Sequence, residues 1–312
     1  MILTLCLNPT FDVTLTVSRL TPGALNRVLT HRVDAGGKGL NVALGLSALG
    51  LEAVPLIMAG EENALQYEAL LRDTGISRVY ETVPGRIRTN TKVMEENGTL
   101  TELNGQGPTA ESKALEAVTE KALELCSTRK ADTLVCTGSL PPGCPADYYR
   151  LLMEKAAAFG TACVLDADGE ALREGLKANP VLIKPNLAEL ERWAGRKLTT
   201  LKEISDAAMA LRRSGIAQVA VSLGGDGALL ACAGSVYYGK APRVKVLSTV
   251  GAGDAMLCGL LWAARRHSSP EELLKAGIAA GSAAVSREGT QPPDPSVMKK
   301  LMDQCEINVL AS

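Results

Sequence analysis

The stretch TLVCTGSLPPGCPADYYRLLMEKAAAFGTACVLD, residues 133–166, carries the pattern that decides the fold. Two short apolar runs, 133–136 and 162–165, flank a segment of helical periodicity at 147–159. The alternation continues through further apolar runs at 181–183 and 219–221 and helical segments at 111–126 and 204–214. Apolar strands separated by amphipathic helices indicate a parallel sheet covered on both faces. The sequence therefore predicts an α/β fold with a central, mostly parallel sheet.

A second pattern consists of short polar strands that lie apart from this alternation. Four runs have the character of strands, with polar residues alternating with apolar ones or predominating: 13–17, 27–33, 86–95 and 99–103. The pair Asn97-Gly98 separates the last two, and Asn-Gly between alternating segments is the strongest short hairpin signal. We expect these parts, about 12–34 and 86–105, to form a small β-sheet lid. No linker or internal repeat interrupts the chain, so we expect one α/β domain over 1–312.

Composition and charge exclude several classes of function. The 312 residues include 33 Lys+Arg and 34 Asp+Glu, a formal net charge of -1, without a basic block. That balance argues against a nucleic-acid partner. The two histidines, His31 and His267, form no His-x-x-x-His pair, and no Cys-x-x-Cys or Gly-x-Ser-x-Gly occurs. Zinc sites and Ser-His-Asp triads therefore find no support.

Cysteine use and hydropathy bear on location. The eight cysteines lie mostly in apolar runs, and residues 1–5 lack the basic flank of a signal peptide. We expect buried free thiols in a reducing compartment. No apolar run reaches the roughly 20 residues of a membrane span. These observations predict a cytoplasmic protein without a membrane partner.

A glycine-rich run at 248–254, Ser-Thr-Val-Gly-Ala-Gly-Asp, precedes a helical segment at 255–266. The backbone N–H groups of Gly251, Ala252 and Gly253, with the positive end of the helix, can form an anion hole for a transferring phosphoryl group. Asp254 can then accept the proton of an attacking hydroxyl, a role for which an ordinary carboxylate pKa suffices. The alternative is that Asp254 only caps the helix.

A second glycine-rich run, Gly-Gly-Lys-Gly-Leu-Asn at 36–41, also opens a helix. Its glycines, Gly37 among them, allow close backbone approach, Lys38 offers a point charge, and Asn41 offers a donor and an acceptor. The alternative is a flexible turn with a solvated lysine. No Gly-x-x-x-x-Gly-Lys-Ser/Thr and no Gly-x-Gly-x-x-Gly occurs, so neither a P-loop nor a dinucleotide fingerprint is present.

Taken together, the two runs resemble the two signatures of the ribokinase-type sugar kinases, the PfkB family. Further matches extend over essentially the whole chain and resemble the 1-phosphofructokinase and tagatose-6-phosphate kinase branch: 8–12, 26–27, 88–90, 138–143, 184–186 with Glu189, and 222–224. The resemblance implies a ribokinase-like three-layer sandwich with a β-sheet lid. It also implies transfer of the γ-phosphate of ATP, with Mg²⁺, to a hydroxyl of a phosphorylated ketohexose.

For the sugar phosphate, the resemblance gives roles to Asp12, Gly37 and Asn41, and the dianion needs fixed cations from the lid or its rim. Arg88 is the first choice because its planar fork suits phosphate oxygens. The other candidates are Arg27, Lys38, Asn90 and Ser139, with Lys92 as a weaker one on the same face as Arg88. For Arg27 and Lys92, a solvated face is an equal alternative.

On the nucleotide side, Asn186 and Glu189 lie three residues apart, so a helical turn places them on one face. By resemblance they organise the water shell of Mg²⁺, and Lys184 approaches the ATP phosphates. The small residues of the next run let the backbone pass close to the nucleotide: Ser222, Gly224, Gly225, Asp226 and Gly227. For Asn186 and Glu189, the alternative is a helix start with a glutamate in its first turn. For the run from Ser222 to Gly227, the alternative is a strand-to-strand turn.

The sequence also departs from this branch. Glu61 and Glu62 stand where more glycine is usual, and Asp168 replaces a small hydroxyl residue. These changes put the substrate in question more than the kinase chemistry. D-fructose 1-phosphate is the first choice, tagatose 6-phosphate the second, and a non-catalytic sugar-phosphate sensor the rival of another class. We also expect a possible homodimer through the lid strands.

Overall fold

A ten-stranded sheet crosses the part of the chain that the computed structural model describes, residues 1–128, 130–287 and 289–311. Its order is β14-β13-β12-β11-β10-β9-β8-β1-β4-β5. Every pair from β11 to β5 is parallel, and the pairs from β11 to β14 are antiparallel. The strands are β1 (Ile2–Cys6), β4 (Ala53–Gly60), β5 (Val79–Val83), β8 (Thr133–Thr137), β9 (Ala162–Asp166), β10 (Leu182–Ile183), β11 (Gln218–Ser222), β12 (Ala228–Cys232), β13 (Ser235–Gly239) and β14 (Ile307–Ala311).

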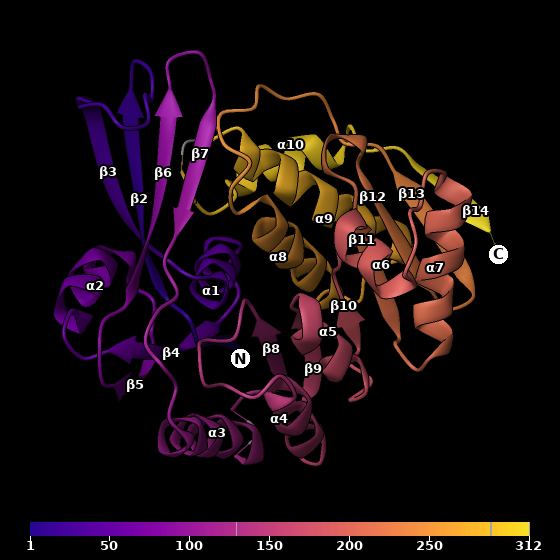
Figure 1. The fold of residues 1–312 in the computed structure, drawn as a ribbon. Coiled ribbons are helices and arrows are strands. Elements are labelled where there is room, and N and C mark those ends of the chain that lie inside the picture. Colours follow the sequence, from indigo (N-terminus) through magenta and orange to yellow (C-terminus); the bar gives the residue numbers. More distant parts are fainter. Residues whose placement is uncertain (129, 288, 312) are drawn as a thin grey trace.

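Helices cover both faces of this sheet and form a three-layer arrangement (Figure 1). One face carries α1 (Lys38–Ala48), α8 (Ala252–Ala264), α9 (Pro270–Val285) and α10 (Pro295–Met302). The other carries α3 (Ser112–Ser127), α4 (Tyr148–Ala157), α5 (Gly169–Leu176), α6 (Leu187–Ala194) and α7 (Leu201–Arg213). A further helix, α2 (Ala64–Leu71), packs with residues of β4 and α1 in a smaller core.

Alternation along the central strands divides the apolar side chains between two cores. In β8, Leu134 and Cys136 enter the core under α3 and α4, whereas Val135 enters the core under α1 and α8. All three side chains are 0% exposed. Successive side chains of a strand point to opposite faces, so an unbroken apolar run is what a doubly covered sheet requires. This confirms the α/β prediction made from 133–166.

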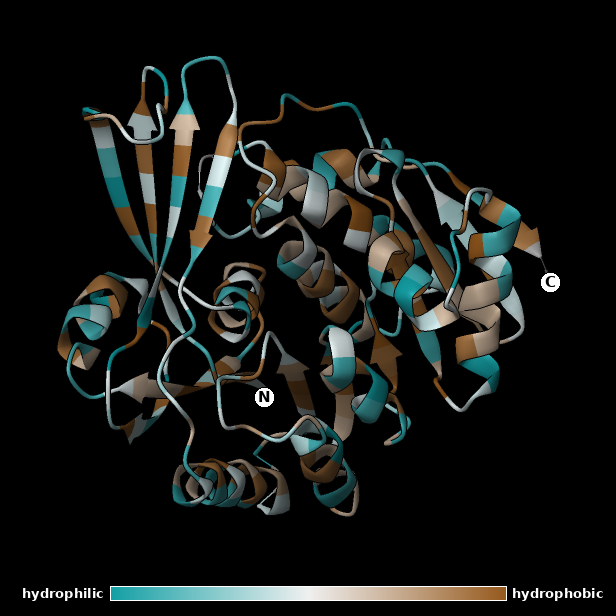
Figure 2. Cartoon of the chain, in the orientation of Figure 1, coloured by the Kyte–Doolittle hydropathy of each residue, from teal (hydrophilic) through white to brown (hydrophobic). Residues whose placement is uncertain are grey.

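The lid is a separate four-stranded sheet of order β3-β2-β6-β7 in the described residues, and it stands above the main body in Figure 1. Its strands are β2 (Thr10–Val17), β3 (Val28–Gly36), β6 (Arg88–Glu95) and β7 (Leu100–Asn104). Figure 2 shows hydrophilic and hydrophobic bands alternating along them, as expected for a sheet with one wet face. The hairpin at Asn97-Gly98 joins β6 to β7, as the sequence predicts.

Several elements were not predicted from the sequence. Two of them are strand β4, all eight residues of which are buried, and strand β14. The parallel pairing of β2 with β6, which sets Thr10 beside Arg88 and Asp12 beside Asn90, was not predicted either. That register brings polar side chains of two distant segments to one place. Within the described chain, no helix combines the length and apolar character needed to cross a membrane.

Candidate active site

The candidate site is a cavity of about 480 Å³ at the carboxyl ends of the parallel strands. Each of five neighbouring strands ends in a residue that lines it, or is followed by one: Asn8 after β1, Ser139 after β8, Asp166 in β9, Lys184 after β10 and Ser222 in β11. The lid supplies one wall, and the first turn of α8 supplies another. Ligands of parallel α/β sheets bind at this edge, where strands turn into helices.

The N-terminus of α8 forms the predicted anion loop. Gly251 is the N-cap residue, with φ of 78°, a backbone conformation that favours glycine. Gly251 and Gly253 both line the cavity, and a Cβ on Gly253 would lie 3.3 Å from Lys184 Nζ. The first N–H groups of a helix have no intrahelical acceptor, and here they adjoin an ammonium group. The loop is therefore suited to an anion.

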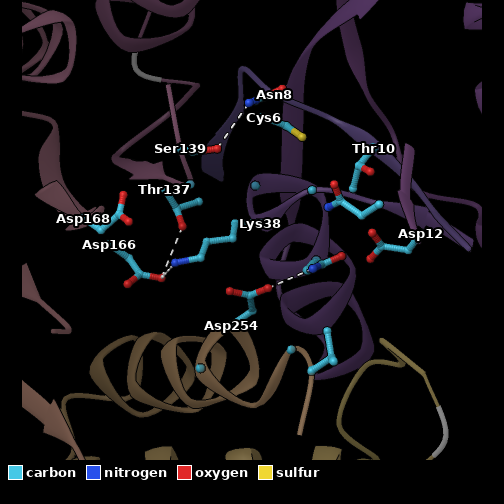
Figure 3. A pocket seen from close by; sticks show the side chains of 18 of the residues that line it. Cys6, Asn8, Thr10, Asp12, Lys38, Thr137, Ser139, Asp166, Asp168 and Asp254 are labelled. Atoms are coloured by element: carbon cyan, nitrogen blue, oxygen red, sulfur yellow. Dashed lines mark hydrogen bonds and ion pairs between the residues drawn. The ribbon is translucent and has the colours of Figure 1, made fainter. Parts of the chain in front are cut away.

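Asp254 does not cap this helix. It is the third residue of α8, its side chain makes no capping bond, and it lines the cavity (Figure 3). Its Oδ2 accepts a hydrogen bond from Asn41 Nδ2 at 2.8 Å. Burial raises the pKa of Asp254 to about 6, above the ordinary carboxylate value that its proposed role requires. The carboxylate is thus ionised at neutral pH, yet more basic than a solvated aspartate.

Asp166 forms ion pairs with two lysines that line the cavity together with the anion loop. Its Oδ1 lies 3.2 Å from Lys184 Nζ and its Oδ2 lies 3.7 Å from Lys38 Nζ. Thr137 Oγ1 donates a hydrogen bond to the same Oδ2 at 3.3 Å, as Figure 3 shows. Burial alone would raise the pKa of Asp166, but the two lysines outweigh it and hold the pKa below its usual value. Lys38 is therefore half-exposed yet paired, and not simply solvated.

Asn186 and Glu189 form a capping box at the start of α6. Asn186 Oδ1 accepts from the Glu189 backbone N–H at 2.9 Å, and Glu189 Oε2 accepts from the Asn186 backbone N–H at 2.9 Å. Both residues also line the cavity. Burial raises the pKa of Glu189, although the backbone N–H of Asn186 and the charges of Lys38 and Lys184 act in the opposite direction. The helix-start alternative is therefore correct as a description of structure, and it leaves Glu189 facing the cavity.

The lid places a polar cluster around Asp12. Lys92 Nζ lies 3.5 Å from Asp12 Oδ2, and Thr290 Oγ1 donates to the same oxygen at 3.4 Å. Asp12 Oδ1 and Asn90 Oδ1 are buried and have no hydrogen-bond partner among the described residues. Buried polar atoms are normally paired, so two open acceptors side by side on paired strands suit the hydroxyls of a ligand.

Arg88 is fixed at the lid side of the cavity by backbone carbonyls. Its Nη1 donates to Gly105 O at 3.1 Å and its Nη2 donates to Asn8 O at 3.2 Å. Its Nε is buried without a partner, and within the described chain Arg88 forms no ion pair. Burial lowers the pKa of its guanidinium. A held, uncompensated cation of this kind suits a phosphate oxyanion.

The glycines at 37 and 39 are required mainly by the fold. A Cβ on Gly39 would overlap the backbone carbonyl of Leu5 in β1, and Thr4 Oγ1 donates to Gly39 O at 2.7 Å. At Gly37, φ is 127° and a Cβ would lie 2.6 Å from Cys6 Sγ. The close backbone approach expected from the sequence is thus an approach of α1 to β1.

Most of the predicted site residues lie together. Those that line the cavity are Asp12, Gly37, Lys38, Asn41, Arg88, Asn90, Lys92, Ser139, Lys184, Asn186, Glu189, Ser222, Gly251, Gly253 and Asp254. Ala252 lies between the two cavity-lining glycines of the anion loop but does not line the cavity. Three residues depart from the pattern of the family branch that the sequence resembles. Asp168 lines the cavity, whereas Glu61 and Glu62 are exposed and lie outside it.

Arg27 lies outside the cavity in the described chain, and its contact with the substrate phosphate stays a prediction. It is exposed and immediately precedes β3, whereas β2 and β3 reach the site at their other ends, where Thr10 pairs with Gly36. Nor do Gly224, Gly225, Asp226 and Gly227 line the cavity. They form the turn between β11 and β12, as the structural alternative predicts. Their contact with a nucleotide stays a prediction.

Some residues at the site were not given a role from sequence. Asp166 follows an apolar run in the same way as Lys184, so the carboxyl-end rule that identified Lys184 could have found it. Asn8 follows the apolar run of β1 in the same manner, and its Nδ2 donates to Ser139 Oγ at 3.2 Å. Thr290 has no such signal, because it lies in the irregular segment between α9 and α10.

This combination defines a class. A doubly covered parallel sheet, a β-sheet lid, an anion loop at a helix N-terminus and a buried carboxylate beside it are the features of a ribokinase-like sugar kinase. A profile described as pfkB family carbohydrate kinase matches residues 5–297. The chain belongs to the pfkB family of carbohydrate kinases.

Individual relatives agree over nearly the whole length. The chain is 35% identical over 304 residues to a 1-phosphofructokinase of Escherichia coli strain K12, covering 97% of each chain. It is 36% identical to a 1-phosphofructokinase of Rhodobacter capsulatus, covering 99% of this chain and 98% of that one. A crystal structure of Escherichia coli phosphofructokinase-2 with fructose-6-phosphate superposes with a TM-score of 0.89 at 30% identity, covering 97% and 98%.

Proposed function

We propose that this chain is an ATP- and Mg²⁺-dependent ketohexose-phosphate kinase, with D-fructose 1-phosphate as the first choice of substrate and fructose 1,6-bisphosphate as the product. The observation that carries the proposal is one cavity with anion-binding groups at two places. Lys184 and the glycine loop adjoin Asp254, and Arg88 is held at the lid. A substrate that already bears a phosphate needs both. The similarity to 1-phosphofructokinases favours fructose 1-phosphate over tagatose 6-phosphate.

The chemistry follows from the position of Asp254. A sugar hydroxyl beside Asp254 attacks the γ-phosphorus of ATP, the bond to the β–γ bridging oxygen breaks, and ADP leaves. Asp254 orients that hydroxyl and accepts its proton, which an ionised carboxylate with a pKa of about 6 can do at neutral pH. The N–H groups of the anion loop and the Lys184 ammonium stabilise the negative charge of the phosphoryl group.

The metal fits the nucleotide side of the cavity. Glu189 is 8% exposed and its Oε2 is occupied by a backbone N–H, which leaves Oε1 to face a cation. Asn186 keeps acceptor capacity beyond its capping bond. These two residues would hold the water shell of Mg²⁺, which usually retains several waters. When bound, the ion neutralises charge on the β- and γ-phosphates.

The sugar side accounts for the remaining residues. The open acceptors of Asp12 and Asn90 would take sugar hydroxyls, and Arg88 would take the substrate phosphate. Lys92 is less available for phosphate, because Asp12 lies 3.5 Å from its ammonium. Closure of the lid over the sugar would exclude water and limit wasteful hydrolysis of ATP.

One experiment separates the candidates. ADP release is measured with fructose 1-phosphate, fructose 6-phosphate, tagatose 6-phosphate, ribose and adenosine, for the native chain and for Asp254→Asn. We expect the highest kcat/KM with fructose 1-phosphate and a loss of at least about 100-fold in the variant, because a positioned base contributes that much or more. Equal activity of the two proteins would refute the base assignment. Preference for ribose would refute the Arg88 phosphate site. Tight binding of a ketohexose phosphate without turnover would identify a sensor.

The lid also supports a homodimer. One row across its four strands consists of Val33, Val13, Thr91 and Leu103, on the face opposite the cavity-lining Asp12 and Asn90. Val33 and Leu103 are 37% and 61% exposed, and no charge interrupts the row. Sedimentation equilibrium should give twice the monomer mass for the native chain and the monomer mass for Leu103→Glu. A native chain that stays monomeric at micromolar concentration would exclude the dimer.

A further inference from the structure

We propose that Asn41 is a positioning residue for Asp254, and that the contact of Gly45 with Cys258 sets the helix separation at which these two meet. The inference rests on the proposed function, in which Asp254 is the base. A carboxylate at the start of α8 is held in one orientation by Asn41 of α1, which lies 213 residues earlier in the chain.

Two residues on each helix form two successive levels of contact. Asn41 and Gly45 are four apart on α1, and Asp254 and Cys258 are four apart on α8, so each pair lies on one face of its helix. At the cavity end, Asn41 Nδ2 donates to Asp254 Oδ2 at 2.8 Å, the bond drawn from Asp254 in Figure 3. One turn deeper, Gly45 faces Cys258.

The deeper level leaves no free space. A Cβ added to Gly45 would lie 2.5 Å from Cys258 Sγ, about 1 Å closer than ordinary van der Waals contact. Cys258 Sγ also donates to Val42 O at 3.3 Å, which joins the thiol to the backbone of α1. Cys258 is 0% exposed. The distance between the helices is therefore determined by the absence of a side chain at position 45.

The cavity-end bond has a chemical consequence for the base. A donor on Oδ2 leaves Oδ1 of Asp254 for the attacking hydroxyl, and it favours the ionised form. Asn41 Oδ1 remains an acceptor, so the sugar contact expected from the family resemblance is compatible with this role. If Asn41 only binds the sugar, its substitution should change KM. If Asn41 positions the base, its substitution should change kcat and the pH at which kcat falls on the acid side of its pH profile.

The test is a compensating pair of substitutions away from the cavity lining. Gly45→Ala should lower kcat by about 100-fold, because a shift of about 1 Å at a reacting group costs that much. Gly45→Ala/Cys258→Ala removes the opposing sulfur, leaves 3.4 Å between the new Cβ and the Cβ of residue 258, and should restore kcat to within about threefold of Cys258→Ala. The matched control is Ser47→Ala on the exposed face of α1, which should match the native chain. A Gly45→Ala enzyme with native kcat, or a double variant without recovery, overturns the proposal.

A second variant keeps the test decisive if Gly45→Ala does not fold. Asn41→Ala removes the donor and should move the acid limb of kcat upward by about one pH unit, the size expected for losing one hydrogen bond to a charged group. A role in sugar binding or in helix packing would leave that midpoint unchanged, and an unchanged midpoint overturns the proposal. If Asp254→Asn is fully active, the proposed function fails. If Asp254→Asn is inactive and the midpoint of Asn41→Ala is native, only the positioning role fails.

Discussion

Replacement of Asp254 by asparagine should stabilise the folded chain at the same time as it removes phosphoryl transfer. Asp254 is 7% exposed, and burial raises its pKa from 3.8 to about 6. The folded state therefore binds this proton more tightly than the unfolded state does. Stability is lost as pH rises from the unfolded value through the folded one, because the folded chain must then hold a poorly solvated charge.

The size of the effect follows from the two pKa values. Each unit of difference is worth about 1.4 kcal/mol, so the ionised carboxylate costs the fold about 3 kcal/mol at pH 8 and about half of that at pH 5. Asparagine has nearly the same shape, carries no charge, and its side-chain oxygen can still accept from Asn41. Asp254→Asn should therefore unfold at higher denaturant concentration than the native chain, with the larger gain at pH 8.

Urea titrations of both proteins at pH 8 and pH 5, followed by circular dichroism, measure this difference. Asp168→Asn is the matched control, since Asp168 lines the same cavity but is exposed, and its stability should stay within about 0.5 kcal/mol of native at both pH values. A destabilised Asp254→Asn, or a gain that does not depend on pH, would contradict the conclusion that Asp254 is held as a strained, buried charge.

Four other outcomes are expected. The native kcat/KM for the sugar phosphate should fall below about pH 6, where Asp254 becomes protonated, and a rate that is flat down to pH 5 would exclude it as the base. Arg88→Lys should raise the KM of the sugar phosphate at least about tenfold and leave the KM of ATP nearly unchanged, because an ammonium cannot reproduce the guanidinium fork. Asp166→Asn should cost about 3 kcal/mol in a urea titration at pH 7, because it leaves the buried Lys184 unpaired, and the difference should shrink only as pH falls below about 4, where Asp166 of the native chain takes up a proton. Gly39→Ala should leave little soluble protein in an expression test, because its Cβ would overlap the backbone of β1.

The sequence was sufficient for the site wherever a residue lies at a strand-to-helix turn. Lys184, Asn186 and Asp254 could be identified because apolar runs, small residues and helical periodicity mark those turns, and the carboxyl ends of parallel strands share one edge. That rule needs no knowledge of which strand lies beside which. It therefore brings together residues from distant parts of the chain before any distance is known.

The rest of the site depends on register and on packing between helices, which local patterns do not encode. Arg27 was grouped with Arg88 because both lie in lid segments, but the pairing of Thr10 with Gly36 places Arg27 beyond the cavity. The family resemblance predicts a sugar contact for Asn41, but it does not predict the bond of Asn41 to Asp254. That bond depends on the separation of two helices, which is determined at Gly45.

The charges of the cavity lining bear on how a nearly neutral chain would bind the two charged substrates proposed for it. Six carboxylates and four cations line it, so the lining itself is net negative. Lys38 and Lys184 are paired with Asp166, and Lys92 with Asp12, which leaves Arg88 as the one lining cation without an ion pair among the described residues. One arginine can serve the phosphate of a sugar, but it cannot also compensate a nucleotide triphosphate. The lining thus favours ATP that arrives with a divalent cation, and Glu189, whose buried carboxylate has a raised pKa, is the lining residue best placed to gain from it.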